Sequence, residues 1–276
     1  MINLFNNPRK QSAFTLVELL VVVAVLALLA SIVFSNLTGA REQAKISNAL
    51  SFQSNMHNLL GADLVGWWKF DESLNDISGY NNHAIYSGSG SPIFVNDTPE
   101  GRGYSLQLNG NIQYGEIHIP LQNVSHEAGT LAFWFKIPSG YPYDRNDIWI
   151  STANAYSGSN SLNMQTNLSY PERVVGFHWS TPDGTGYNHY TFNYNEPNFI
   201  EKNWNHLLIT WSENTGYFIY INGSLIGSRT TDTPLRSFDD DYLRIKGSGD
   251  ILYSEIMIYS RMFNAMESIM FYSLKL

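Results

Sequence analysis

Hydrophobic positions divide this chain into an N-terminal part with helical spacing and a longer part with strand spacing. Residues 19–34 contain no charged residue, and as a helix they would rise about 24 Å, slightly less than a hydrocarbon core of about 30 Å. Phe14–Val17 supply the missing length, which predicts a single membrane span at about residues 16–36. Apolar residues continue near helical spacing up to a stop at Gly61, so the predicted helix covers residues 14–60.

From Asp63 onward the spacing changes to a period of two, which is typical of strands. Asn222-Gly223 lies between two alternating runs and predicts a tight hairpin. Asn264 followed by Glu267 resembles a capping box and predicts a short final helix. The clearest alternating faces are Leu131, Phe133, Phe135 and Ile137; Leu207, Ile209 and Trp211; and Tyr217, Ile219 and Ile221.

Many short strands separated by Gly, Asn, Asp and Pro predict a mainly β chain, with a long N-terminal α-helix followed by an antiparallel sandwich or barrel. Further strands are predicted at residues 64–70, 104–108, 112–119, 147–151, 174–179, 189–194, 242–246 and 252–259.

Composition narrows the classes of partner. The net charge is −8, and loss of the first thirteen residues, which hold two basic and no acidic side chains, would make it −10. Such a charge argues against nucleic acid or anionic lipid as the partner and is compatible with cation binding. There is no cysteine, which excludes disulfides and thiolate sites. Aromatic and charged residues each make up 14% of the chain, a profile that suits an exported β domain.

Two basic residues, Arg9 and Lys10, precede the apolar run, and Glu18 lies just inside it. A basic segment followed by an apolar one is typical of a secretory signal. A carboxylate at membrane depth costs about 2.5–3.5 kcal/mol, so Glu18 is expected to have a partner.

Residues 9–18, Arg-Lys-Gln-Ser-Ala-Phe-Thr-Leu-Val-Glu, resemble the class III signal of type IV pilins and type II secretion pseudopilins. The resemblance implies a leader of residues 1–13, cleavage between Ala13 and Phe14 by a prepilin peptidase, and N-methylation of Phe14. It also implies that Glu18 neutralises the amino terminus of a neighbouring pilin or pseudopilin subunit during assembly. Ala13 stands where the family usually has Gly, and Ser35 where it often has Pro.

The same resemblance implies a location. The chain would cross the bacterial cytoplasmic (inner) membrane once with its leader inside and its head outside the cytoplasm, and would reach the cell surface or a pilus if it assembles.

Residues 63–276 resemble the laminin G-like, concanavalin A-like jelly roll of bacterial surface proteins, and this resemblance implies the same β-sandwich here. The segments that carry it are residues 64–72, 76–84, 204–223 and 254–261.

A calcium site is the first candidate for chemistry in the head. Oxygen ligands gather at Asp76, Ser78, Asn81 and Asn82, and hard cations prefer six to eight such ligands. The family resemblance implies that Glu255 lies nearby and adds a carboxylate. The alternative is that Asp76 and Asn81 bond only their own turn backbone.

The sequence of the head lacks a clear set of catalytic residues, so the head is predicted not to be an enzyme. Glycoside hydrolysis needs two carboxylates about 5–10 Å apart, and the best strand, residues 252–259, carries only Glu255. The seven histidines lack metal-ligand spacing, and a histidine such as His206 is expected to be packed. Sugar binding by aromatic side chains at residues 141–145 and 170–172, or by Trp179, Tyr187 and Tyr190, is a weaker indication.

The sequence therefore predicts a pilin-like or pseudopilin subunit, present as a minor component. It would assemble through its N-terminal helix and display a lectin-like head that binds a glycan or a surface protein. The first alternative is a membrane-anchored, carbohydrate-binding adhesin that never polymerises, and the second is a polysaccharide hydrolase on the same fold.

Overall fold

The computed structural model describes residues 15–31, 60–108, 115–137, 148–152, 162–167, 174–180, 187–193, 200, 202–230, 241–246 and 251–274. The chain divides into two compact units, Met1–Asn58 and Leu59–Leu276. Each unit is described by itself.

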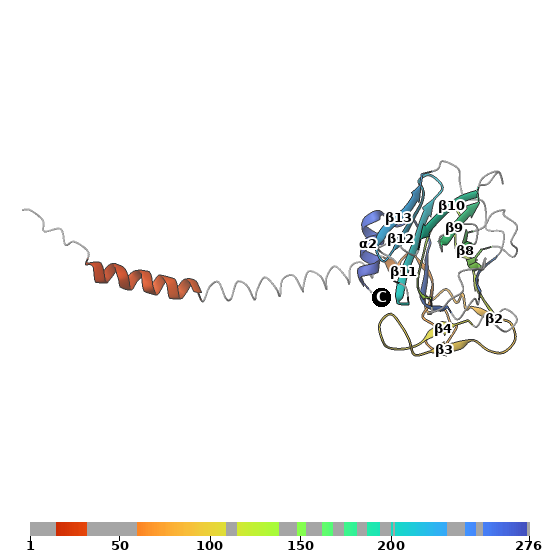
Figure 1. The fold of residues 1–276 in the computed structure, drawn as a ribbon, viewed down its shortest axis with the longest axis horizontal. Helices are drawn as coiled ribbons and strands as arrows, with labels where there is room; N and C mark the ends of the chain where they lie inside the picture. Colours follow the sequence, from red (N-terminus) through yellow and green to blue (C-terminus); the bar gives the residue numbers. More distant parts are fainter. Residues whose placement is uncertain are drawn as a thin grey trace, which may run out of the picture. The chain divides into compact units, whose positions relative to one another are not determined.

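The N-terminal unit contains a helix over residues 16–31, drawn in red in Figure 1. Its large apolar side chains are all exposed, from 48% at Val22 to 78% at Leu16. Within the described ranges, no helix meets the length and apolarity needed to cross a bilayer. Residues 32–59 of the predicted helix, the end of the predicted span at residue 36, and the pair Ala13 and Phe14 lie outside the described residues.

The head is a sandwich of two antiparallel sheets (Figure 1). One sheet has the order β13-β12-β11-β6-β15-β4-β3, with β1 also paired to β15, and the other has the order β10-β9-β8-β7-β14-β5-β2. The strands of the first sheet are β1 (Leu64–Trp68), β3 (Ile93–Val95), β4 (Ser105–Gln107), β6 (Ala128–Lys136), β11 (Trp204–Ser212), β12 (Gly216–Ile221), β13 (Ser224–Arg229) and β15 (Leu252–Tyr259). Those of the second are β2 (Ile85–Ser87), β5 (Glu116–Pro120), β7 (Ile148–Ser151), β8 (Leu162–Asn167), β9 (Val174–Ser180), β10 (Tyr187–Asn193) and β14 (Tyr242–Lys246).

The alternating faces predicted from the sequence form the core between the sheets. Phe133 and Phe135 of β6, like Ile209 of β11, are at most 1% exposed and belong to one hydrophobic cluster with residues of β5 and β14. The hairpin prediction is also confirmed, since Asn222 (φ 49°) and Gly223 (φ 76°) turn between β12 and β13. Positive φ at both positions matches the twist of a two-residue hairpin.

Short or polar strands escaped prediction. β2 and β3 have three residues each, too few to show a period, and β8 reads Leu-Asn-Met-Gln-Thr-Asn with two apolar positions. Their places are set by pairing with neighbouring strands, β2 with β5, β3 with β4, and β8 with both β7 and β9.

The final helix, α2 (Ala265–Leu274), lies against the outer face of the first sheet. The ring of Tyr272 packs 5.7 Å from that of Trp134 in β6, and that of Phe271 packs 5.6 Å from that of His206 in β11. The capping box is present, because Glu267 N–H donates to Asn264 Oδ1 at 3.0 Å and Asn264 N–H donates to Glu267 Oε2 at 2.8 Å. Burial lowers the pKa of His206 to about 3, so this histidine is neutral and packed, as expected.

A buried hydroxyl pair connects the sheet to the segment that leads into α2. Thr130 and Thr210 are fully buried with their Oγ1 atoms 2.8 Å apart, and Phe263 N–H donates to Thr210 Oγ1 at 2.7 Å.

We expect Thr210→Val to lower the free energy of unfolding by about 1–3 kcal/mol, because the buried Phe263 N–H loses its shorter hydrogen bond while side-chain volume is unchanged. Urea unfolding followed by tryptophan fluorescence measures this, since all seven tryptophans lie after residue 60. Thr230→Val, at an exposed position, is the control. Equal stability of the two variants would contradict the assignment.

Candidate functional site

Strand β15 changes neighbours halfway along its length. One edge pairs with β6, while the other pairs first with β4, through Leu252 and Tyr253, and then with β1 from Ile256 onward. At the change, the register against β6 shifts and Glu255 adopts a φ of 50°. A bulge with a left-handed residue re-aims a side chain, and here it turns Glu255 toward the gap where β4 and β1 separate.

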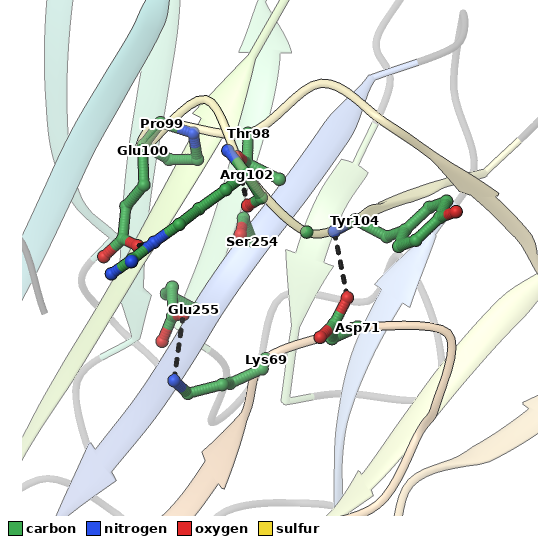
Figure 2. Close-up of a pocket in the computed structure, with 10 residues that line it drawn as sticks. Lys69, Asp71, Thr98, Pro99, Glu100, Arg102, Tyr104, Ser254 and Glu255 are labelled. Atoms are coloured by element: carbon green, nitrogen blue, oxygen red, sulfur yellow. Dashed lines mark hydrogen bonds and ion pairs between the residues drawn. The ribbon is translucent and has the colours of Figure 1, made fainter.

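A pocket of about 270 Å³ occupies this gap (Figure 2). We call it the fork pocket. Its walls are Lys69 and Asp71 after β1, residues 98–100 and 102–104 before β4, and Ser254 and Glu255 of β15. Residues from three distant parts of the chain thus meet at one position.

Glu255 is the most buried charged group of the fork pocket. It is 9% exposed, its Oε2 accepts a 2.6 Å hydrogen bond from Trp67 Nε1, and its Oε1 lies 3.9 Å from Lys69 Nζ. Burial raises the pKa of Glu255 to about 7, with smaller contributions in the same direction from Glu100 and Asp71. The Trp67 hydrogen bond and the Lys69 charge lower the pKa without cancelling the effect of burial.

The loop before β4 is held against the loop after β1 by short contacts. Asp71 Oδ1 accepts from Tyr104 N–H at 3.1 Å (Figure 2). Thr98 Oγ1 donates to Arg102 O at 2.8 Å, and Arg102 Nε pairs with Glu100 Oε2 at 3.1 Å. Gly103 has a φ of 81°, and a Cβ there would lie 3.2 Å from Asp71 Oδ1. This wall of the pocket is therefore ordered by its own hydrogen bonds.

The predicted calcium loop is held by hydrogen bonds to Asp76. The Oδ1 atom of this residue accepts from the N–H groups of Trp67 and Ser78, and its Oδ2 atom accepts from Ser78 Oγ and Asn82 N–H, all at 2.8–2.9 Å. Burial alone would raise the pKa of Asp76, but these hydrogen bonds outweigh it and lower the pKa. An ionised carboxylate has about four acceptor positions, so the Asp76 carboxylate is saturated with donors.

The other predicted ligands are divided between two places. Asn82 Nδ2 donates to Val65 O at 2.8 Å, whereas Asn81 is exposed with a φ of 60°. Glu255 contacts the Trp67 indole, while Asp76 contacts the Trp67 backbone. In the part of the chain that the structure describes, no group of three or more His, Cys, Asp or Glu side chains could hold a metal ion. The arrangement favours the alternative that Asp76 bonds the turn backbone, and the calcium site stays a prediction.

Glu18 takes part in a capping box at the start of the N-terminal helix. Its Oε2 accepts from Thr15 N–H and from Thr15 Oγ1, both at 2.9 Å, while Glu18 N–H donates to Thr15 Oγ1 at 3.3 Å. The Thr-x-x-Glu spacing in the sequence is that of a capping box, a signal that sequence reasoning did not use.

Most of the fork pocket was not found from the sequence. Of its residues, only Glu255 is a predicted site residue. Lys69 and Asp71 lie in the segment 64–72 that carries the family resemblance but have no predicted role there, and Glu100 belongs to no motif. The signal that could have indicated a loop is Pro99-Glu100-Gly101-Arg102-Gly103, but it carries no information on its neighbours. The aromatic candidates at residues 141–145 and 170–172 lie outside the described residues, as do the side chains of Trp179, Tyr187 and Tyr190.

Two family models match the chain. Residues 109–267 match the concanavalin A-like lectin/glucanases superfamily, and residues 8–34 match the prokaryotic N-terminal methylation motif. The chain therefore belongs to the concanavalin A-like lectin/glucanases superfamily and carries at its N-terminus the methylation motif of pilin-like proteins.

Relatives connect the chain to secretion systems. The chain is 30% identical over 129 residues to the type II secretion system core protein G of Aeromonas hydrophila, covering 44% of this chain and 89% of that protein. It is 29% identical over 140 residues to that of Klebsiella pneumoniae, covering 51% and 94%. The chain is thus homologous to type II secretion pseudopilins, which implies association with other pilin or pseudopilin subunits and processing by a prepilin peptidase.

Solved structures share the fold of the head. The binding domain of botulinum neurotoxin DC, solved with rat synaptotagmin II, is 14% identical with a TM-score of 0.62, covering 79% of this chain and 52% of that one. The binding domain of Paraclostridial Mosquitocidal Protein 1 is 17% identical with a TM-score of 0.61, covering 77% and 52%. The chain spans about half the length of these structures, and at such identity the likeness shows the fold alone.

We expect Asp76→Ala to lower the free energy of unfolding by about 3 kcal/mol or more, because several backbone N–H groups lose their acceptor. Asn75→Ala, an exposed neighbour, should stay within about 0.5 kcal/mol of the unchanged chain. Thermal unfolding in calcium and in EDTA separates this explanation from metal binding. The hydrogen-bond arrangement predicts the same unfolding midpoint in calcium and in EDTA. A midpoint that is higher in calcium, with the difference abolished by Asp76→Ala, would support the predicted calcium site.

We expect the stability of the head to fall as pH rises from about 4.5 to about 7. The pKa of Glu255 is about 7 when folded and 4.5 in the reference state, so between these values the native chain binds more protons than the unfolded chain. The full effect is roughly 3 kcal/mol above pH 7. Glu255→Gln, which keeps an acceptor for the Trp67 indole, should be more stable than the unchanged chain at pH 8 and equal to it near pH 4. Glu127→Gln, at an exposed position, is the control, and parallel pH profiles for all three chains would contradict the role of burial.

Proposed function

We propose that this chain is a pseudopilin-like subunit of the bacterial cytoplasmic membrane that assembles through its N-terminal helix and displays a lectin-like head for adhesion or recognition. The observation that carries the proposal is Glu18, an acidic residue in the first turn of a helix whose large apolar side chains are all exposed. Such a helix gains stability by packing against lipid or against identical helices. A bulky head suits a minor component better than the main repeating subunit.

Glu18 has two possible partners in this function. Within one chain it caps its own helix through Thr15. Cleavage after Ala13 would create an amine at Phe14. When subunits associate away from water, the Phe14 amine of a neighbouring subunit would need a counter-charge, which Glu18 would supply. Assembly would then exchange the cap for an ion pair between subunits.

Two substitutions separate these roles. Gln can replace Glu in a capping box but carries no charge, so Glu18→Gln keeps the helix cap and loses the ion pair. We expect Glu18→Gln and Glu18→Ala both to reduce incorporation into filaments at least tenfold while membrane insertion is retained. Immunoblots of sheared filaments and of the membrane fraction measure the two quantities. Normal incorporation of Glu18→Gln would show that only the cap matters and would remove the ion pair between subunits. Absence of the unchanged chain from sheared filaments would favour the non-polymerising adhesin.

Processing provides an independent test. The intact mass of the mature protein should correspond to a chain that begins with a methylated Phe14. A chain that retains residues 1–13 would contradict membership of the assembling class.

We infer that the head binds its ligand rather than hydrolysing it. Hydrolysis by two carboxylates needs a proton donor and a partner carboxylate. Glu255 has the raised pKa of a donor, but Asp71 Oδ1 accepts from Tyr104 N–H and Glu100 pairs with Arg102. Release of reducing sugar from a polysaccharide that depends on Glu255 would instead support the hydrolase.

A further inference from the structure

The fork pocket contains a buried carboxylate whose counter-charge lies too far away to donate a hydrogen bond. Lys69 Nζ stands 3.9 Å from Glu255 Oε1, beyond hydrogen-bonding distance. The short bond from the Trp67 indole goes to the other oxygen, Oε2. Glu255 Oε1 therefore faces the pocket with room for a closer donor.

A second acceptor lies beside it. Ser254 is 3% exposed and lines the same pocket. Figure 2 shows its side chain between the loop before β4 and Glu255. A hydroxyl oxygen accepts hydrogen bonds, so a ligand with N–H groups could donate to Ser254 Oγ in this pocket.

The charges around the fork pocket favour a cation. Three carboxylates, Asp71, Glu100 and Glu255, face two basic side chains. Arg102 is 85% exposed and already paired with Glu100. The Lys69 side chain is 44% exposed. With Glu255 ionised, one additional positive charge would balance the pocket.

Lys69 shows which kind of cation the pocket accepts. Its ammonium group lies 4.6 Å from the ring centroid of Trp67 and is directed toward Glu255 (Figure 2). An aromatic face beside a carboxylate is a favourable environment for an ammonium ion. The Lys69 ammonium group thus occupies the position expected for a bound ammonium ion, but it lies 3.9 Å from Glu255 Oε1. An ammonium group of a ligand could approach this oxygen more closely.

We propose that the fork pocket binds a primary ammonium group of a ligand, with Glu255 Oε1 and Ser254 Oγ accepting two of its three N–H groups. Lys69 would then turn outward into solvent. This inference rests on the proposed function, in which the head recognises a ligand, and specifies the chemistry that the head recognises.

The ammonium group has two possible sources, an amino sugar of a surface glycan or a lysine side chain of a protein. Glucosamine and Nα-acetyl-lysine amide represent them. Their neutral counterparts are N-acetylglucosamine and Nα,Nε-diacetyl-lysine amide, which differ from the probes only by acylation of the amine. Each pair therefore isolates the positive charge.

The experiment uses the full chain in a zwitterionic detergent without a sugar headgroup, with binding followed by calorimetry and tryptophan fluorescence. We expect at least one charged probe to bind at least tenfold more tightly than its acylated counterpart. Glu255→Gln should reduce its affinity roughly tenfold or more, because a charge-assisted hydrogen bond is lost. Lys69→Met should raise the affinity severalfold by removing the internal competitor, and Glu127→Gln should leave it unchanged.

Several results would overturn the proposal. Equal binding of charged and acylated probes would show recognition of hydroxyl or amide groups instead. Binding that is unaffected by Glu255→Gln would place the ligand elsewhere, and failure of both charged probes to bind would remove the site. Glu18→Gln should leave binding unchanged, so a chain that binds the probe but never enters filaments would overturn the proposed assembly function and not this inference.

Discussion

The head depends on the position of β15, the last strand of the chain and yet an inner strand of its sheet. It hydrogen-bonds to β6 along one edge and to both β4 and β1 along the other. The first and last strands thus close the sheet together, at a sequence separation of 188 residues between Trp67 and Glu255. Arg261, just after β15, strengthens this closure by binding Asp63 at 2.6 Å and both carboxylate oxygens of Glu267 at 2.9 Å. The fork pocket exists because two shorter strands share one edge of a longer one.

Two buried carboxylates of the head illustrate opposite solutions to the cost of burying charge. Asp76 receives four hydrogen bonds and its pKa is lowered, so its ionisation contributes to holding the loop against β1. Glu255 receives one short hydrogen bond and a distant ammonium group, and its pKa is raised. A buried carboxylate that stabilises the fold is expected to have several hydrogen bonds and a lowered pKa, as Asp76 does. A carboxylate that costs stability at neutral pH, placed by a strained bulge in a pocket, is consistent with a role in binding.

The two units of the chain use hydrophobic surface in different ways. The head buries its apolar side chains between two sheets and under α2, so it possesses a core of its own. The large apolar side chains of the helix of residues 16–31 are exposed. Homology to secretion pseudopilins and a concanavalin A-like sandwich are thus combined in one chain. The proposed function assigns association to the helix and recognition to the head.

The sequence alone determined features that depend on local periodicity and short motifs. Alternation in β6, β11 and β12, the Asn222-Gly223 hairpin, the cap of α2 and the methylation motif around Glu18 could all be predicted, because each signal lies within about ten residues. Three-residue strands such as β2, the polar β8 and nearly all of the fork pocket could not. Lys69, Glu100 and Glu255 become neighbours only when β15 enters the sheet between β6 and the pair β1 and β4. The electrostatic character of Glu255 was likewise decided by tertiary structure, since burial and the distance to Lys69 have no signature in the chain.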